Sequence, residues 1–89
     1  NQQSISAETH LGMILHREHN MVEAMKLYRH AAESGGGYAD AQYLLGLVLL
    51  EGANGVEKNF IEGEKWLNMA ALQGEEHAIS HWRKSTHIY

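Results

Sequence analysis

Seven histidines are the residues of this sequence whose type and spacing could do chemistry, and that chemistry would be metal binding. They stand at positions 10, 16, 19, 30, 77, 81 and 87. His77 and His81 are four residues apart in a predicted helix, a spacing that can chelate zinc, and His16 and His19 are three apart near a helix end. The sequence has no cysteine, no H-E-x-x-H motif and no third ligand in register. Histidines on an interaction surface explain the pattern more simply, so a metal-binding module is the minor alternative and no cofactor is expected.

Nucleophiles and phosphate-binding loops are the other chemistry to look for. The serines at positions 4, 6, 34, 80 and 85 have no nucleophile-elbow context. The glycines at 35–37 follow a predicted helix instead of joining a strand to a helix, which is typical of a helix end and not of a phosphate loop. The sequence therefore predicts no catalytic residue, and we do not expect an enzyme.

Composition limits the remaining classes. The chain has 89 residues, 44% apolar and 20% charged, with no proline, which fits one largely helical domain spanning residues 1–89. Its net charge is −4 and its basic residues are scattered, which argues against nucleic-acid binding. The longest strongly apolar stretch, 43–50, is too short to span a membrane, and no signal peptide is predicted. The first residue is not methionine, which indicates a piece of a longer protein, and the compartment stays open.

The sequence repeats itself in two blocks. Residues 7–15 align with residues 41–49 at an offset of 34 and share the pattern A-x-x-x-L-G-x-x-L. Residues 20–32 align with residues 59–71 at an offset of 39. The difference between the offsets falls at 51–58, where Gly52, Asn54 and Gly55 indicate a loop. Such periods are typical of stacked helical repeats.

Each block has the spacing of an amphipathic helix. Apolar residues recur at i, i+4, i+7 and i+8 from both Ala7 and Ala41, and Asn20 and Asn59 are each followed three residues later by the glutamate of a capping box. The predicted helices span 5–16, 21–33, 39–50, 60–73 and 75–86. The first four would form two pairs, and the fifth would cover the end of the stack.

Small residues recur at the same register in both repeats. Glycine inside a helix costs about 1 kcal/mol relative to alanine, so Gly12 and Gly46 predict a close approach by the paired helix. The predicted contacts are Tyr28 and Leu67. The alanine pairs at 31–32 and 70–71 favour close packing too, although alanine is also simply a good helix former.

These residues resemble the Sel-1-like repeat, a relative of the tetratricopeptide repeat. The resemblance covers about residues 5–82 and rests on Ala41, Leu45, Gly46, Gly52, Gly55, Val56, Trp66, Ala70, Ala71 and Gly74. Gly63 departs from the family pattern, which has alanine there. The resemblance implies an all-α fold, an α-α superhelix: a right-handed solenoid of antiparallel helix pairs with about two repeats, 5–37 and 38–74, and a capping helix at 75–86. It also implies an adaptor or scaffold for protein partners.

In such stacks the first helix of each pair lines the concave face. The register then predicts partner-binding residues on three helices: Thr9, Met13, His16, Asp40, Tyr43, Leu47, Leu50, His77, Ser80 and Lys84. Exposed contiguous apolar surface usually marks a contact site, but the apolar members could instead pack on neighbouring helices. Two functions stay open. The chain either grips a peptide or helix of a partner, or is a structural segment of a longer repeat protein whose binding face lies elsewhere.

Overall fold

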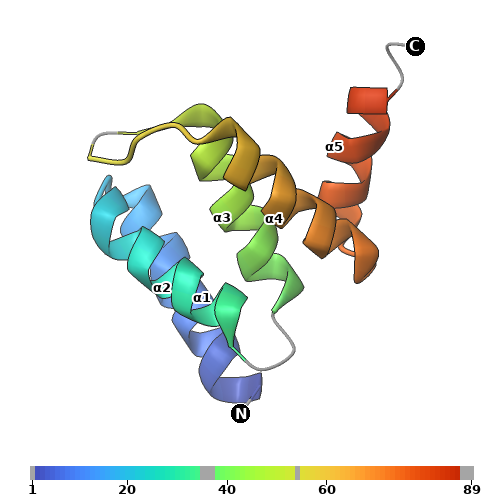
Figure 1. The fold of residues 1–89 in the computed structure, drawn as a ribbon. Helices are drawn as coiled ribbons and strands as arrows, with labels where there is room; N and C mark the ends of the chain where they lie inside the picture. The colour runs from blue at the N-terminus through green and yellow to red at the C-terminus, as the bar shows by residue number, and fades with distance from the viewer. Residues whose placement is uncertain (1, 35–37, 54, 87–89) are drawn as a thin grey trace.

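The computed structural model describes residues 2–34, 38–53 and 55–86, with side chains described over 6–34, 38–53 and 55–81. Five helices make up this part of the chain: α1 (Gln2–Arg17), α2 (Met21–Glu33), α3 (Ala39–Glu51), α4 (Phe60–Leu72) and α5 (Glu76–Thr86) (Figure 1). No strand occurs within the described ranges, where residues 53 and 56 form only an isolated bridge. The prediction of an all-α fold of about two repeats and a cap is confirmed.

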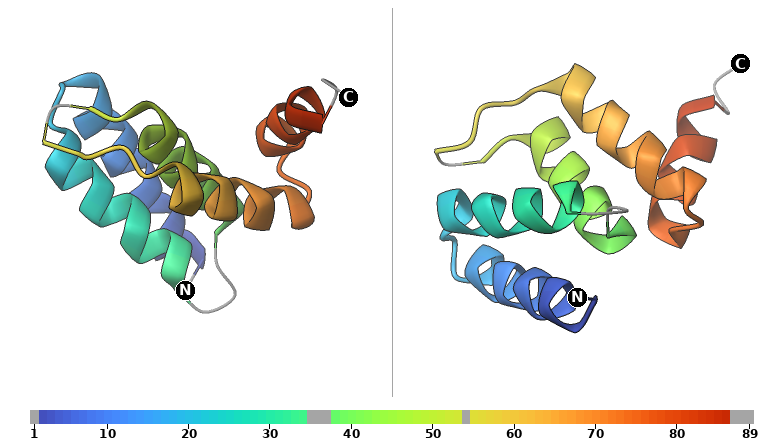
Figure 2. Two further views of the ribbon diagram at one scale, coloured as in Figure 1. Left: turned by 45° about the horizontal axis from the view of Figure 1, so that its top comes forward. Right: turned by 60° about the horizontal axis from the view of Figure 1, so that its bottom comes forward.

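The helices stack in chain order. The main packing pairs are α1 with α2, α2 with α3, α3 with α4, and α4 with α5. Figure 2 shows the first pair and the second pair side by side, with α5 beyond α4 at the end of the stack. Neighbouring helices are therefore neighbours in sequence, as a repeat architecture requires.

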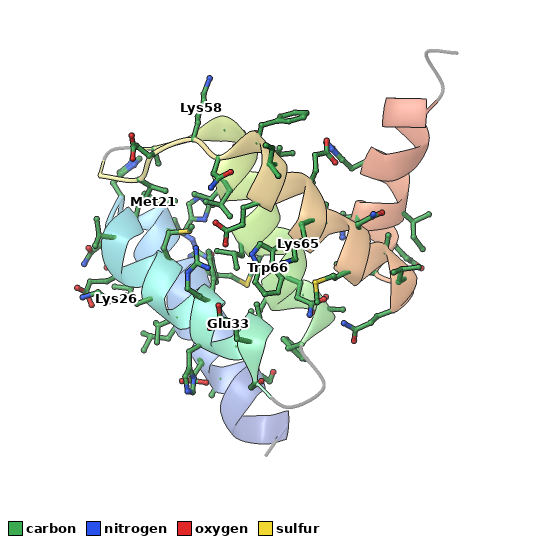
Figure 3. All side chains as sticks on the ribbon, in the orientation of Figure 1. Met21, Lys26, Glu33, Lys58, Lys65 and Trp66 are labelled. Carbon is green, nitrogen blue, oxygen red and sulfur yellow. The ribbon has the colours of Figure 1, made fainter. Side chains whose placement is uncertain are left out.

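The core lies where α2 and α3 meet. Tyr28 and Leu45 are fully buried there, and Trp66 reaches from α4 toward α2 (Figure 3). Five alanines among the described residues are completely buried: Ala24, Ala31, Ala41, Ala70 and Ala78. Burial of such small residues at helix contacts lets the backbones approach closely, which favours the packing interpretation of the alanine pairs.

The two helix glycines pack as predicted. A Cβ atom added to Gly12 would lie 2.7 Å from Cε1 of Tyr28, and one added to Gly46 would lie 2.9 Å from Cγ of Leu67. At Gly46 the same Cβ would also lie 2.8 Å from the backbone oxygen of Gly63. This contact explains why Gly63 departs from the family pattern. A glycine at position 63 has no Cβ atom, so the backbones of α3 and α4 can come into contact there.

Two positions of the repeated apolar stripe have opposite environments in the two repeats. Leu45 and Val48 of α3 are buried in the core shared with α2. The equivalent residues of α1, 34 positions earlier, are Leu11 and Ile14, which are 49% and 45% exposed. Nothing within the described residues covers this surface as α2 covers α3. We call Leu11 and Ile14 the free α1 face.

Helices α4 and α1 each end in a turn with one residue in the left-handed backbone conformation, which favours glycine. Gly74 has a φ of 91°, its N–H donates to Ala71 O at 2.9 Å, and Glu75 N–H donates to Ala70 O at 3.0 Å. These two bonds form the Schellman motif that ends α4. The turn after α1 uses the same pattern with His19 in the left-handed position, at a φ of 64°. His19 therefore serves a turn and lies apart from any ligand set.

Only one of the two predicted asparagine caps forms. Asn59 Oδ1 accepts a hydrogen bond from Glu62 N at 3.1 Å, which confirms the cap of α4. Asn20 makes no side-chain capping bond, so that prediction is wrong. The reason is the short connection from α1. Asn20 is also the last residue of the turn at His19, its N–H is held by Leu15 O at 2.8 Å, and its ψ of 67° lies outside the extended range typical of a cap.

We expect Asn59→Ala to lower the free energy of unfolding by about 1 kcal/mol, because the N–H of Glu62 loses its acceptor. The matched variant Asn20→Ala should cost less than about 0.5 kcal/mol, since no side-chain bond is lost. Urea denaturation followed by circular dichroism measures both. Equal losses of unfolding free energy in the two variants would contradict the conclusion that Asn59 caps its helix and Asn20 does not.

An ion pair joins the two repeats across α2 and α4. Arg29 Nη1 donates to Glu62 Oε2 at 2.7 Å, and Trp66 Nε1 donates to the same oxygen at 3.0 Å. The hydrogen bonds from Arg29 and Trp66 lower the pKa of Glu62. Because Arg29 is partly exposed, the pair fixes orientation more than it adds stability. None of the described helices is long and apolar enough to cross a membrane.

Candidate functional site

A hollow of about 250 Å³ lies between the first helices of the successive repeats. Its described lining comes from α1, from α3 with the residue before it, and from the start of α5: Thr9, His10, Met13, Tyr38, Asp40, Tyr43, Leu44, Glu75 and His77. We call this hollow the groove. Sites for drug-sized molecules usually occupy about 300–1,000 Å³, so the groove is the size for side chains of a peptide.

The repeat register builds the groove. Thr9, Tyr43 and His77 are separated by 34 residues each, and all three line it, one from each of α1, α3 and α5. The rings of Tyr43 and His77 stack with centroids 5.3 Å apart and planes at 30°. Equivalent positions of the two repeats and of the capping helix therefore meet on one surface, as stacking in register requires.

One side of the groove is acidic. Glu75 is a nearly buried side chain, 9% exposed, whose Oε1 accepts from Ala78 N at 2.8 Å and whose Oε2 lies 3.1 Å from His77 Nδ1. Asp40, in the first turn of α3, is exposed. The hydrogen bond to Glu75 raises the pKa of His77, and the charges of Glu75, Glu76 and Asp40 raise it further.

The pKa of Tyr43 is affected by nearby negative charges as well. Burial raises the pKa of its hydroxyl, and the charges of Glu75 and Glu51 add to that effect. No lysine or arginine occurs among the described residues of the lining. The groove therefore combines an apolar wall with a negative rim, an arrangement that favours a positively charged ligand group.

Half of the residues predicted for partner binding meet in the groove. These are Thr9, Met13, Asp40, Tyr43 and His77. Thr9 is 3% exposed and has an interaction of its own, whereas Met13 is 41% exposed at the groove surface. The accessible apolar contact on α1 is therefore Met13.

The other five predicted residues lie elsewhere or outside the described side chains. His16 is half-buried against Tyr28, with Nδ1 3.2 Å from the hydroxyl, whose pKa burial raises to about 12. Leu50 packs against the buried cluster of α4 and α5, beside Gly63 of α4, and does not line the groove. Leu47 is half-buried and Ser80 is exposed, and neither is among the lining residues, while the side chain of Lys84 lies outside those described.

The sequence interpretation missed four residues of the groove: His10, Tyr38, Leu44 and Glu75. His10 and Leu44 follow Thr9 and Tyr43 directly, so a wider window on each helix would include them. Tyr38 and Glu75 precede their helices by one residue. Their signal is positional, because residues just before equivalent helices of a repeat lie at the same edge of the stack.

The predicted histidine pairs do not form a ligand cluster in the described part of the chain. No group of three His, Cys, Asp or Glu residues within it could hold a metal ion. His77 faces Glu75, while Nε2 of His81 lies 3.5 Å from Oε1 of Glu64 on α4. The i, i+4 histidines therefore have separate acidic neighbours.

Comparison with known proteins decides the family. The family model of the Sel1 repeat matches residues 6–36 and residues 39–75. The chain belongs to the Sel1 repeat family. Sel1 repeats generally mediate protein–protein interaction and are generally non-enzymatic. No curated protein and no solved structure matches the chain.

The opposite side of this Sel1 repeat unit carries a second hollow between α2 and α4. Its described lining includes Trp66, Met69, Leu72 and Gln42. Gln42 is buried and already bonded, because its Nε2 donates to Ala32 O at 3.3 Å and its Oε1 accepts from Gln73 at 2.8 Å. This second hollow lacks the stacked rings of the groove, and the acid in its described lining, Glu33, lies 3.5 Å from Arg29, so we base the functional proposal on the groove.

Proposed function

We propose that this Sel1 repeat unit is an interaction module, an adaptor or scaffold, that holds a peptide or helix of a partner protein in the groove. The observation that carries the proposal is the convergence of α1, α3 and α5 on one hollow with exposed apolar and aromatic surface. Helical and extended segments of partners commonly bind in such apolar hollows, where a few anchoring side chains supply most of the affinity.

Met13 is the side chain best placed to serve as an anchor. It lines the groove, it is 41% exposed, and it is absent from the two core clusters. Methionine adapts its shape to varied apolar partners, which suits a surface that accepts side chains. A charge at this position should therefore disturb binding without disturbing the core.

The test selects random 12-residue peptides by display against the whole chain and measures the selected peptides by fluorescence anisotropy. We expect Met13→Glu to weaken their binding at least tenfold, because desolvating a carboxylate opposes apolar contact. Circular dichroism and thermal melting should show that the variant keeps the fold.

Ile14→Glu is the matched control for this experiment. Ile14 is the next residue of α1, is similarly exposed at 45%, and lies on the free α1 face instead of the groove. Its substitution should leave peptide binding within about twofold of wild type. A failure to select any peptide, or equal binding by wild type and Met13→Glu, would reject the groove as the binding site.

The second candidate function is a structural segment of a longer repeat protein. The free α1 face favours it, because the equivalent residues of α3 are covered by α2. A helix resembling α2 would fit there in the same way. In that case Ile14→Glu, and not Met13→Glu, would disturb the association of the chain with neighbouring repeats.

A further inference from the structure

We infer that the groove selects partner segments in which a lysine or arginine accompanies an apolar side chain. The inference rests on the proposed function and adds the chemistry of the partner. The apolar side chain would contact Met13 and Leu44, and the cation would lie at the rim formed by Asp40 and Glu75. The occupant is thus a basic, partly apolar peptide segment.

The first support is charge complementarity inside one hollow. Asp40 in the first turn of α3 and Glu75 just before α5 both line it, and the described lining contains no lysine or arginine to balance them. Asp40 is exposed and accessible. A cation placed between two carboxylates in a hollow is attracted more strongly than at an open surface, because the walls exclude part of the water.

The second support is the state of His77. Its side chain is 73% exposed while that of Glu75 beside it is 9% exposed, and its Nδ1 lies 3.1 Å from Oε2 of Glu75. The hydrogen bond to Glu75 raises the pKa of His77, and the positive charge that His77 brings to Glu75 is lost as the pH rises through that pKa. A partner lysine or arginine, which keeps its charge, would neutralise the rim more completely.

The third support is the aromatic surface beside the rim. Tyr43 and His77 stack at 5.3 Å, and Tyr38 also lines the groove. The long aliphatic stems of lysine and arginine pack along apolar and aromatic surface while their charged ends reach polar groups. The groove offers both in one place, which an acidic or a purely apolar segment would not use.

The experiment reads the composition and the charge dependence of peptides selected from the random 12-residue library on the whole chain. We expect enrichment of lysine and arginine near an apolar residue relative to the unselected library. In each selected peptide, replacing the basic residue by glutamine should weaken binding to the wild type about tenfold. The double variant Asp40→Asn with Glu75→Gln should bind the basic and the glutamine peptide within about twofold of each other.

Two controls separate specific recognition from general attraction to an acidic protein. Glu57→Gln removes an exposed acid from the loop between α3 and α4, outside the groove, and should leave the tenfold preference intact. Raising salt from about 0.1 M to about 1 M shortens the screening length from about 10 Å to about 3 Å. The preference of the wild type should then fall, while the double variant should show little change.

The outcomes distinguish this inference from the proposed function. Selected peptides that depend on Met13 but show no basic enrichment would overturn the inference and leave the groove as the binding site. Basic peptides that keep their preference on the double variant, or lose it on Glu57→Gln, would overturn it as well. Absence of selectable peptides, or binding unaffected by Met13→Glu, would overturn the proposed function and this inference with it.

Discussion

Leu45→Ala is expected to lower the free energy of unfolding by about 2–5 kcal/mol, whereas Leu11→Ala should lower it by less than about 1 kcal/mol. The two leucines occupy the same position of the repeat, 34 residues apart. Leu45 is completely buried where α2 meets α3, and Leu11 is 49% exposed on the free α1 face. The same chemical change therefore leaves a cavity in one repeat and trims a half-exposed surface in the other.

The expected loss of stability in Leu45→Ala matters because domains of this size are only marginally stable. A single domain typically unfolds with about 5–15 kcal/mol, so the loss at Leu45 would be a large share of the total. Urea denaturation of both variants, with the slope of the transition compared with that of wild type, measures the difference. Similar losses at the two sites would mean that the free α1 face is covered in solution, and a rise in apparent mass would then identify self-association.

Local pattern predicted the helices well because each repeat encodes its own. The spacing of apolar residues from Ala7 and from Ala41 predicted α1 and α3, although α1 begins three residues earlier than expected. The same pattern could not show that one stripe is buried and the other exposed. That difference depends on which helix packs against the stripe, and the spacing of apolar residues within one helix does not identify the neighbouring helix.

The caps show the same limit at shorter range. Asn20 and Asn59 have identical sequence signals, each with a glutamate three residues later. Only Asn59 caps, because Asn20 also completes the turn around His19. A capping motif considers one helix at a time, so it does not show that Asn20 both ends the turn after α1 and precedes α2.

The candidate site was predictable in register and less so in detail. Repeating the position of Thr9 at intervals of 34 residues found Tyr43 and His77, which meet in the groove. Leu50 packs toward α4 and does not line the groove, and its place depends on the close approach of α3 and α4. Glu75 was missed since it precedes its helix, where helical periodicity gives no signal.

That close approach makes Gly46 the second site of a large expected effect. Alanine is the better helix former by about 1 kcal/mol, so an isolated α3 would gain from Gly46→Ala. In the folded chain the new Cβ would lie 2.8 Å from Gly63 O, 2.9 Å from Leu67 Cγ and 3.1 Å from Leu67 N. Two of these atoms belong to the backbone of α4, which cannot move without shifting the helix.

We therefore expect Gly46→Ala to destabilise the fold by about 2–3 kcal/mol, the range of overpacking a well-filled interface. Gly12→Ala is the matched comparison, because its Cβ would meet chiefly the ring of Tyr28, at 2.7 Å and 2.9 Å, while the backbone oxygen of Ala24 is 3.5 Å away. Side chains yield more readily than backbone, so the loss at Gly12 should be smaller. Urea denaturation of both variants gives the comparison. A Gly46→Ala variant as stable as wild type would show that α3 and α4 are farther apart in solution.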